Sequence, residues 1–273
     1  MDITLLDGPL GTELLDRGVA TPLPGWSAHA LETAPQVLCA IHREYASAGA
    51  HVHTANTFRT QPLRFPDHWE ALLQRAVTCA RTALEGFDVR LAGSMAPVAD
   101  CYRPEESPPD ARVTHRAMAR ALRDAGVDLL LVETFPHLGE LWAAVEEAVA
   151  TGLPTWASAT AGPNADLLSP EQLGQAARGA VERGATAVLV NCVPAARVAD
   201  YLPHLAGLGV PFGAYANAGR AAPVMGFMPE RIAPDRYADY AAQWVASGAS
   251  IVGGCCGTGV AHITELARRF TSA

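Results

Sequence analysis

The chain has 273 residues, of which 49% are hydrophobic, and carries a formal net charge of −8. This charge and the lack of any run of basic residues argue against a nucleic-acid-binding surface, and no apolar run approaches the roughly 20 residues that a membrane span requires. All 20 basic residues are arginine, which excludes a catalytic lysine Schiff base. The composition therefore favours small-molecule chemistry.

The start of the chain and its cysteines predict a cytoplasmic protein. The chain leads directly into an apolar stretch at 3–6, without the basic segment and longer apolar core of a secretory signal. The 6 cysteines lack the dense spacing of a small secreted disulfide scaffold. We therefore expect reduced thiols throughout, with Cys39, Cys79 and Cys101 in packing or loop positions.

Apolar, β-rich stretches alternate with helical patterns along the chain. Strands are predicted at 3–6, 51–57, 89–95, 128–133, 155–160, 187–192, 212–217 and 250–255. Apolar residues at helical spacing predict helices at 37–48, 69–84, 112–125, 139–150, 170–183, 195–208, 235–246 and 263–270. Glycine, which is favoured just past a helix C-terminus, precedes several strands at Gly49, Gly126, Gly184 and Gly248.

This alternation predicts an α/β fold, a (β/α)₈ TIM barrel formed as a single domain by residues 1–273. The length suits that fold, and no segment has the composition of a linker. A doubly wound open sheet is the alternative. The first strand is not followed by the G-x-G-x-x-G fingerprint that would support it.

Polar and thiol side chains stand at the predicted C-terminal ends of the strands, where barrel enzymes carry their active sites. They are Asp7, Asn56, Thr57, Glu133, Cys192, Asn217, Cys255 and Cys256. Since parallel strands of a barrel end at the same mouth, we expect these groups to face one another.

Three cysteines at strand ends form a candidate metal site. Cys192 ends one apolar run, and Cys255 and Cys256 follow two glycines at the end of another. Successive side chains of a regular strand point to opposite faces, so the adjacent cysteines can converge only where glycine lets the backbone bend. Three thiolates leave an open position on a tetrahedral zinc ion, as in a catalytic site. The alternative is that the cysteines are small buried apolar residues.

The motifs at these strand ends resemble those of the homocysteine S-methyltransferase family, which has S-methylmethionine-dependent, betaine-dependent and cobalamin-dependent branches. The matching sequences are LDGPLGTEL at 6–14, ANTF at 55–58, VET at 132–134, VNC at 190–192, YANAG at 215–219 and GGCCGT at 253–258. They occur in the family's order, and the resemblance covers nearly the whole chain.

The resemblance implies a metal site and an amino-group site. Cys192, Cys255 and Cys256 would hold Zn²⁺, on which the substrate thiol is activated. A thiol bound to zinc is deprotonated, so its sulfur can attack a methyl group. Asp7 and Glu133 would hold the amino group of homocysteine.

The resemblance also implies contacts to the rest of the amino acid. Backbone N–H groups of the turn at 7–12, that of Gly8 among them, would hold its carboxylate. Pro9 stands where the family usually has Gly or Ala, and proline lacks an N–H, so its neighbours must supply the donors. Asn56 and Thr57, in the motif of the second strand, are assigned to the substrate site.

Two further residues are assigned by resemblance. Asn217 matches the family position whose side chain can complete the zinc site when substrate is absent, although Asn-Ala-Gly is also ordinary turn sequence. Trp26 matches the aromatic residue that the family places over its methyl donor, where the ring would stabilise a cation. A cover over the barrel mouth is the alternative role for Trp26.

We therefore predict a cytoplasmic, zinc-dependent enzyme that transfers a methyl group to the thiolate of homocysteine and so produces methionine. S-methylmethionine or S-adenosylmethionine is the predicted donor, and selenohomocysteine or selenocysteine is an alternative acceptor. Both partners are small molecules, and neither nucleic acid nor membrane is expected. Assembly as a homo-oligomer is left open.

Two other functions stay open. In the first, the chain is a freestanding homocysteine-activating module that receives its methyl group from a separate corrinoid protein, since it contains no cobalamin module of its own. In the second, it is a zinc-binding or redox-sensing protein that uses Cys255 and Cys256 as a switch. Asp7 and Glu133 argue against sensing, because a sensor needs no groups that bind ammonium.

Overall fold

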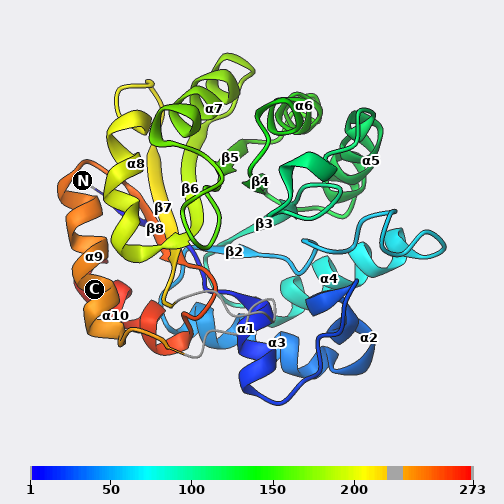
Figure 1. Cartoon of the computed structure of the whole chain (residues 1–273). Helices are drawn as coiled ribbons and strands as arrows, with labels where there is room; N and C mark the ends of the chain where they lie inside the picture. The colour runs from blue at the N-terminus through cyan, green and yellow to red at the C-terminus, as the bar shows by residue number, and fades with distance from the viewer. Residues whose placement is uncertain (1, 220–229, 272–273) are drawn as a thin grey trace.

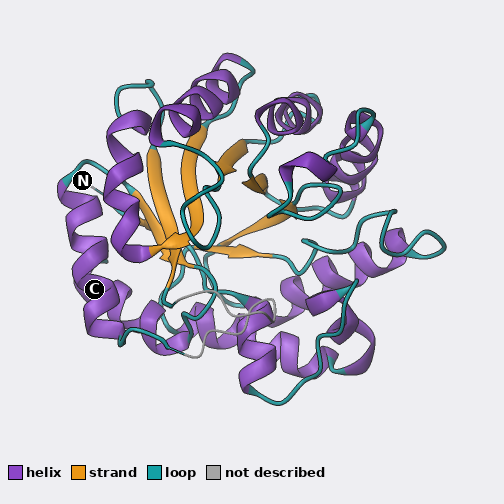
Figure 2. Cartoon of the chain, viewed as in Figure 1, coloured by secondary structure: helices purple, strands orange, loops and turns teal. Residues whose placement is uncertain are grey.

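Strands and helices alternate along the chain in the computed structural model, which describes residues 2–219 and 230–271. The strands are β1 (Thr4–Leu5), β2 (Val52–Thr54), β3 (Arg90–Met95), β4 (Leu129–Phe135), β5 (Thr155–Ala159), β6 (Ala187–Pro194), β7 (Phe212–Asn217) and β8 (Ile251–Gly254). The α-helices are α1 (Leu10–Asp16), α2 (Ala30–Thr33), α3 (Pro35–Ser47), α4 (Trp69–Ala83), α5 (Ala111–Asp124), α6 (Leu138–Val149), α7 (Pro170–Glu182), α8 (Val198–Leu205), α9 (Pro234–Ala246) and α10 (Val260–Phe270). The strands gather at the centre and the helices surround them (Figures 1 and 2).

The strands form one parallel sheet in the order β1-β8-β7-β6-β5-β4-β3-β2. Its two outer strands meet through a parallel bridge between Leu6 and Val52. Two backbone hydrogen bonds support this closure, from Asp7 N–H to the Val52 carbonyl at 3.0 Å and from His51 N–H to the Leu5 carbonyl at 2.7 Å. The predicted (β/α)₈ barrel is thereby confirmed, and the doubly wound alternative is wrong.

All eight predicted strands are present, and no strand end differs from its predicted position by more than three residues. Asn56 and Thr57 lie beyond β2, and Cys255 and Cys256 lie beyond β8, rather than inside those strands. The stretch at 7–12, expected to be a turn, enters α1 at Leu10 after Pro9 at the N-cap position. α1 has only 7 residues and contains Gly11 in its first turn, so its helical pattern is too short to recognise. No helix within the described residues is long and apolar enough to cross a bilayer.

Two layers of apolar side chains hold the barrel together. Inside the ring of strands, one buried apolar cluster contains Leu6, Leu131, Trp156 and Leu189. Outside the strands, each helix buries the face predicted by its spacing, as α4 does with Leu72, Leu73, Ala76, Val77 and Ala80. This second layer continues around the barrel. The strand ends are therefore fixed on both sides.

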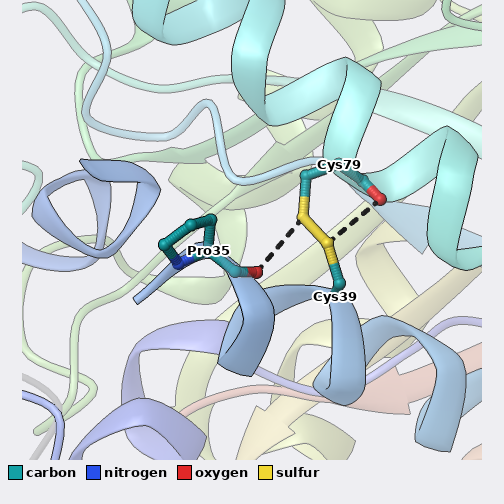
Figure 3. Close-up of a disulfide and its surroundings, with 3 residues drawn as sticks. All are labelled: Pro35, Cys39 and Cys79. Carbon is teal, nitrogen blue, oxygen red and sulfur yellow. Dashed lines mark hydrogen bonds between the residues drawn. A yellow bond between two sulfur atoms is a disulfide. The ribbon is translucent and has the colours of Figure 1, made fainter. Parts of the chain in front are cut away.

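A disulfide links Cys39 on α3 to Cys79 on α4, with their Cα atoms 5.7 Å apart (Figure 3). The expectation that every thiol is free is wrong for this pair. The two residues are 40 positions apart in the sequence, so spacing gave no sign that two neighbouring helices bring them together. Cys101, Cys192, Cys255 and Cys256 are free.

Tyr237 on α9 joins the ends of β7 and β8 from outside the barrel. Its side chain is fully buried. Its hydroxyl accepts a hydrogen bond from Ala216 N–H at 3.0 Å and donates one to the Gly253 carbonyl at 2.7 Å. A single side chain thus holds two strands just before the mouth of the barrel.

Replacing Tyr237 with Phe should lower the free energy of unfolding by about 1–3 kcal/mol, because the Ala216 N–H and the Gly253 carbonyl are then buried without a partner. Urea denaturation followed by circular dichroism measures the loss. Tyr240→Phe on the same helix is the control, since its hydroxyl only accepts a 3.5 Å contact from exposed Arg236. Equal stability of the two variants would contradict the role given to Tyr237.

Candidate active site

A pocket opens at the C-terminal ends of the strands and contains most of the predicted site residues. Its lining includes Asp7, Gly8, Trp26, Asn56, Glu133, Cys192, Cys255 and Cys256. Thr57 and Asn217 do not line it. Thr57 is fully buried beneath the mouth and donates a hydrogen bond to the Ser94 carbonyl at 2.9 Å. This contact gives Thr57 a structural position rather than a place in the lining.

The three strand-end cysteines converge. Their sulfur atoms lie within 4.8 Å of one another, and those of Cys192 and Cys255 are 2.7 Å apart. Cys192 adopts a left-handed backbone with φ of 53°, where β6 slips in register against β7. Such a conformation is costly for a residue with a Cβ and is typical of functional sites. It turns the Cys192 thiol toward the end of β8.

The two glycines before the cysteine pair, Gly253 and Gly254, allow neighbouring side chains to pack closely against the backbone of β8. Of the three glycines expected to let the backbone bend in this motif, Gly257 has a positive φ of 82°, whereas Gly253 and Gly254 lie in β8. A Cβ on Gly253 would overlap the Leu6 side chain, and one on Gly254 would overlap that of Thr258. The end of β8 can therefore approach β1 and its own following turn only with glycine at these positions.

Asn191, one residue before Cys192, ties together the irregular ends of β4, β5 and β6. Its Oδ1 accepts hydrogen bonds from Thr134 N–H at 3.2 Å and from the Ser158 hydroxyl at 2.8 Å. Its Nδ2 donates to Thr134 Oγ1 at 2.7 Å. Thr134 has a φ of 65° where β4 slips in register against β5. Asn191 lies in the motif VNC, but the sequence gives no sign that its side chain reaches two neighbouring strands.

Asp7 follows β1 and is buried in the pocket. Thr54 of β2 holds both of its oxygens, with N–H to Oδ2 at 2.8 Å and the hydroxyl to Oδ1 at 3.1 Å. Burial raises the pKa of Asp7 to about 8, although the bonds from Thr54 favour the charged form and the nearby Glu133 disfavours it. Asp7 therefore carries a proton at neutral pH until a cation arrives.

Glu133, in β4, is the second buried carboxyl group of the pocket. The Ser94 hydroxyl donates to Oε1, and the Tyr215 hydroxyl donates to Oε2 at 2.9 Å. Burial raises the pKa of Glu133 to about 7, against the effect of both hydrogen bonds. Neither Ser94 nor Tyr215 was singled out by sequence, although both occupy predicted strands. A cation between Asp7 and Glu133 would favour the ionised form of both.

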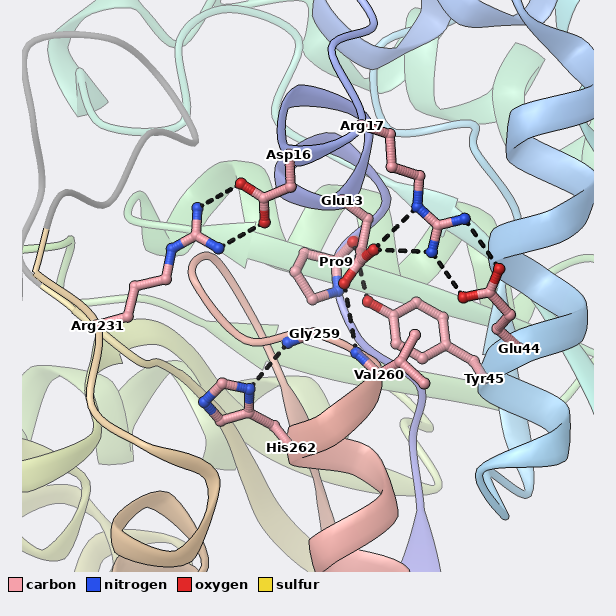
Figure 4. A network of polar contacts seen from close by, with 10 residues as sticks. All are labelled: Pro9, Glu13, Asp16, Arg17, Glu44, Tyr45, Arg231, Gly259, Val260 and His262. Carbon is pink, nitrogen blue, oxygen red and sulfur yellow. Dashed lines mark hydrogen bonds and ion pairs between the residues drawn. The ribbon is translucent and has the colours of Figure 1, made fainter.

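The segment from Asp7 to α1 is fixed by packing and by a network of ion pairs (Figure 4). Glu13 of α1 accepts from Arg17 at 2.9 Å and from Val260 N–H at 3.3 Å, and Arg17 also pairs with Glu44 of α3. The Tyr45 hydroxyl donates to the Pro9 carbonyl at 3.2 Å. These contacts join α1 to α3 and to the start of α10.

Two glycines of the same segment touch aromatic side chains. A Cβ on Gly8 would overlap the Tyr45 ring and hydroxyl, and a Cβ on Gly11 would overlap the Trp26 indole. Trp26 is in contact with Phe58 edge to face, with ring centroids 6.2 Å apart. The pocket wall next to α1 is therefore aromatic.

Asn56 positions the loop that carries Trp26. Its Oδ1 accepts from the Ser27 hydroxyl at 2.8 Å, and its Nδ2 donates to the Ser27 carbonyl at 2.9 Å. Tyr102, from the loop after β3, also lines the pocket and packs against Cys192 and Cys256. Sequence reasoning missed Tyr102 because its loop carries no motif.

The chain and its fold are similar to those of known proteins. The model of the family described as homocysteine S-methyltransferase matches residues 4–270. Homocysteine S-methyltransferase of Escherichia coli K12 is 32% identical over 98% of this chain and 95% of the relative. Methionine synthase of Mycobacterium leprae is 31% identical over 96% of this chain, which corresponds to 24% of that protein.

A solved structure extends the similarity to three dimensions. The metallated form of the homocysteine methyltransferase MmuM from Escherichia coli has a TM-score of 0.83 and 29% identity, and the match covers 98% of this chain and 96% of that one. The sequence motifs, the barrel and the relatives thus lead to one conclusion. The chain belongs to the homocysteine S-methyltransferase family.

Proposed function

We propose that this family member holds Zn²⁺ on Cys192, Cys255 and Cys256 and transfers a methyl group to the thiolate of homocysteine, which becomes methionine. The observation that carries the proposal is the convergence of three cysteine sulfurs and two buried carboxyl groups on one pocket. Homocysteine has a thiol at one end and an ammonium group at the other. The pocket offers a partner for each.

The donor set suits zinc. Thiolate ligands select soft or borderline metals over magnesium and calcium, and the E. coli relative exists in a metallated form. Asn217, at the end of β7, is buried, and neither atom of its amide has a hydrogen-bond partner among the described residues. We assign this amide as the ligand that completes the site without substrate. Bound zinc would keep the substrate sulfur deprotonated.

Asp7 and Glu133 would fix the other end of the substrate. Thr54, Ser94 and Tyr215 hold the carboxyl oxygens in place, so an ammonium group between them has a defined position. The first residues of α1, Leu10 and Gly11, line the pocket beside Asp7, and we assign backbone N–H groups of this segment to the substrate carboxylate. With both ends held, the sulfur is oriented for attack, and orientation supplies much of the rate.

Trp26 and Phe58 would receive the methyl donor. We assign S-methylmethionine or S-adenosylmethionine to this aromatic wall, because a sulfonium next to an aromatic face gains roughly 0.5–2 kcal/mol. The sulfur of homocysteine forms the new bond to the methyl carbon as the bond to the donor sulfur breaks, and the leaving thioether keeps the electron pair. Once the methyl group has left, the donor sulfur is an uncharged thioether, which the aromatic rings no longer attract as a cation.

We also propose a cytoplasmic location, because the three clustered thiols of Cys192, Cys255 and Cys256 need a reducing compartment to remain available to a metal. The Cys39–Cys79 disulfide lies outside this pocket, between α3 and α4.

The purified reduced protein should carry about one zinc per chain, and replacing Cys192, Cys255 or Cys256 with Ser should remove both the metal and the activity. Elemental analysis measures zinc. Cys101→Ser is the matched control, since Cys101 lines the pocket but lies outside the cluster. The barrel has its own core, so the chelated protein should keep its far-UV circular dichroism. Full occupancy in Cys256→Ser would remove Cys256 from the site.

Glu133→Gln keeps the shape of the side chain and removes its charge, so homocysteine should bind about 10- to 100-fold more weakly while zinc stays bound. Isothermal titration calorimetry on the zinc-loaded protein measures the affinity. Glu140→Gln is the control, because Glu140 is equally buried but contacts His115 and Val98 N–H, away from the pocket. Unchanged affinity in Glu133→Gln would refute the assignment.

Trp26→Ala should raise the KM for a sulfonium donor severalfold, with zinc content and homocysteine affinity nearly unchanged. Initial rates with S-methylmethionine and S-adenosylmethionine provide the measurement. If the wild-type protein uses neither sulfonium but accepts a methyl group from a methylated corrinoid protein, the donor assignment is wrong. The methionine synthase relative makes that the second donor to assay.

A further inference from the structure

Asp7, His42 and His53 form a second cluster of metal-binding side chains, which shares no residue with the three cysteines. Their ligand atoms all lie within 4.8 Å of one another. Asp7 follows β1, His42 is on α3, His53 is on β2, and all three are buried. Neither histidine belongs to the motifs by which the chain resembles its family, and neither has a role in the proposed methyl transfer. The cluster therefore needs an explanation of its own.

His53 is oriented as a metal ligand. Its Nε2 lies 3.3 Å from the Ala50 carbonyl, which can only accept a hydrogen bond, so Nε2 carries a proton. Burial lowers the pKa of His53 to about 4, so the ring is neutral and Nδ1 offers a lone pair. This Nδ1 has no hydrogen-bond partner among the described residues. Histidines that bind a metal commonly have the N–H of the other ring nitrogen held in this way by a backbone carbonyl.

The separation of His53 from Asp7 suits two ligands of one ion. His53 Nδ1 lies 3.9 Å from Asp7 Oδ2, which is too far for a hydrogen bond. Two ligand atoms bound to one zinc ion at about 2.1 Å lie at most about 4.2 Å apart, so the distance falls within this limit. Thr54 fixes the Asp7 carboxyl group, with its N–H 2.8 Å from Oδ2 and its hydroxyl 3.1 Å from Oδ1. Asp7 and His53 are thus both held by outer contacts, as metal ligands are.

His42 supplies a third ligand. Its Nδ1 is buried and has no hydrogen-bond partner within residues 2–219 and 230–271. Burial, with the nearby His53 as a smaller cause, lowers the pKa of His42 to about 3, so this ring is also neutral, the form that binds metals. Two imidazoles and one carboxylate are a known set of zinc ligands. Because Asp7 also lines the pocket, an ion can reach the cluster from there.

We propose that Asp7, His42 and His53 form a second, weaker zinc site, and that zinc bound there opposes binding of the amino-acid substrate. The site is weaker than the cysteine cluster because it has no thiolate, so it fills only when free zinc is in excess. An ion on Asp7 occupies the carboxyl group that would receive the substrate ammonium and repels that ammonium. This opposition, but not the site itself, rests on the proposed function, in which Asp7 binds the ammonium group.

Equilibrium dialysis against zinc tests the site. Reduced wild-type protein should bind a second equivalent when free zinc is in excess, and Cys256→Ser should keep that equivalent while it loses the first. His53→Val and His42→Leu should each keep only the first. His51→Asn is the matched control and should bind both, since His51 lies outside the cluster and Asn keeps an acceptor for Leu5 N–H. Far-UV circular dichroism checks that each variant is folded.

The effect on substrate is measured with L-methionine, which has the ammonium group but no free thiol. Calorimetry is performed with free zinc held constant by a metal buffer. Methionine should bind wild type about 10- to 100-fold more weakly when both sites are filled than when only the cysteine site is filled, because one charge-assisted contact is lost. In His53→Val, the same rise in free zinc should leave methionine affinity unchanged.

A single equivalent of zinc in wild type would overturn the inference, and a buried water molecule would then be the group that joins the three side chains. Retention of the second equivalent by both His53→Val and His42→Leu would also overturn it. Two bound ions with no change in methionine affinity would refute the opposition to substrate. If neither methionine nor homocysteine binds the protein with one zinc, the proposed function itself fails, while the zinc count still decides whether the second site exists.

Discussion

The geometry of the candidate site depends on the side-chain amide of Asn191. β4 and β6 both leave regular register at their ends, where Thr134 and Cys192 take left-handed backbone conformations. Regular ladder bonds cannot form there, and the Asn191 amide bonds to Thr134 and Ser158 instead. Glu133 immediately precedes one irregular residue, and Asn191 immediately precedes the other. One amide therefore helps to set the positions of both the Glu133 carboxyl group and the Cys192 sulfur.

The pocket concentrates acidic groups where solvent cannot screen them. Four thiols and two carboxyl groups share one mostly apolar lining, in a chain that already has a net charge of −8. Burial is the largest cause that raises the pKa of Asp7 to about 8 and that of Glu133 to about 7. The proposed metal on the sulfurs and the proposed ammonium group between the carboxyl groups would each favour ionisation of these side chains. The site is organised for ligands that bring positive charge.

The barrel and most of its catalytic mouth follow from sequence because both have local signals. The alternation of strand and helix patterns repeats eight times along the sequence. Once the strands are placed, Asp7, Glu133 and the three clustered cysteines are found at or just after strand ends. The supporting residues have no such signal. Ser94, Tyr215 and Thr54 read as ordinary strand residues until the strands are placed side by side, and Asn191 acts across two neighbouring strands. The Cys39–Cys79 bond likewise depends on how α3 packs on α4. All of these contacts depend on which residues of distant segments lie side by side. The spacing of apolar residues along the chain carries no information about that.

The two glycines in contact with aromatic rings restrict how this protein can evolve. Any side chain at Gly8 would collide with Tyr45, and any at Gly11 with Trp26. Tyr45 in turn holds the Pro9 carbonyl, so a change on one side demands a simultaneous change on the other. Single mutations at these two glycines are therefore blocked. The loop after β2 makes a similar contact, since a Cβ on Gly25 would overlap the Phe65 ring. Sequences that descend from this one should therefore vary at the mouth of the barrel mainly at positions other than these three glycines.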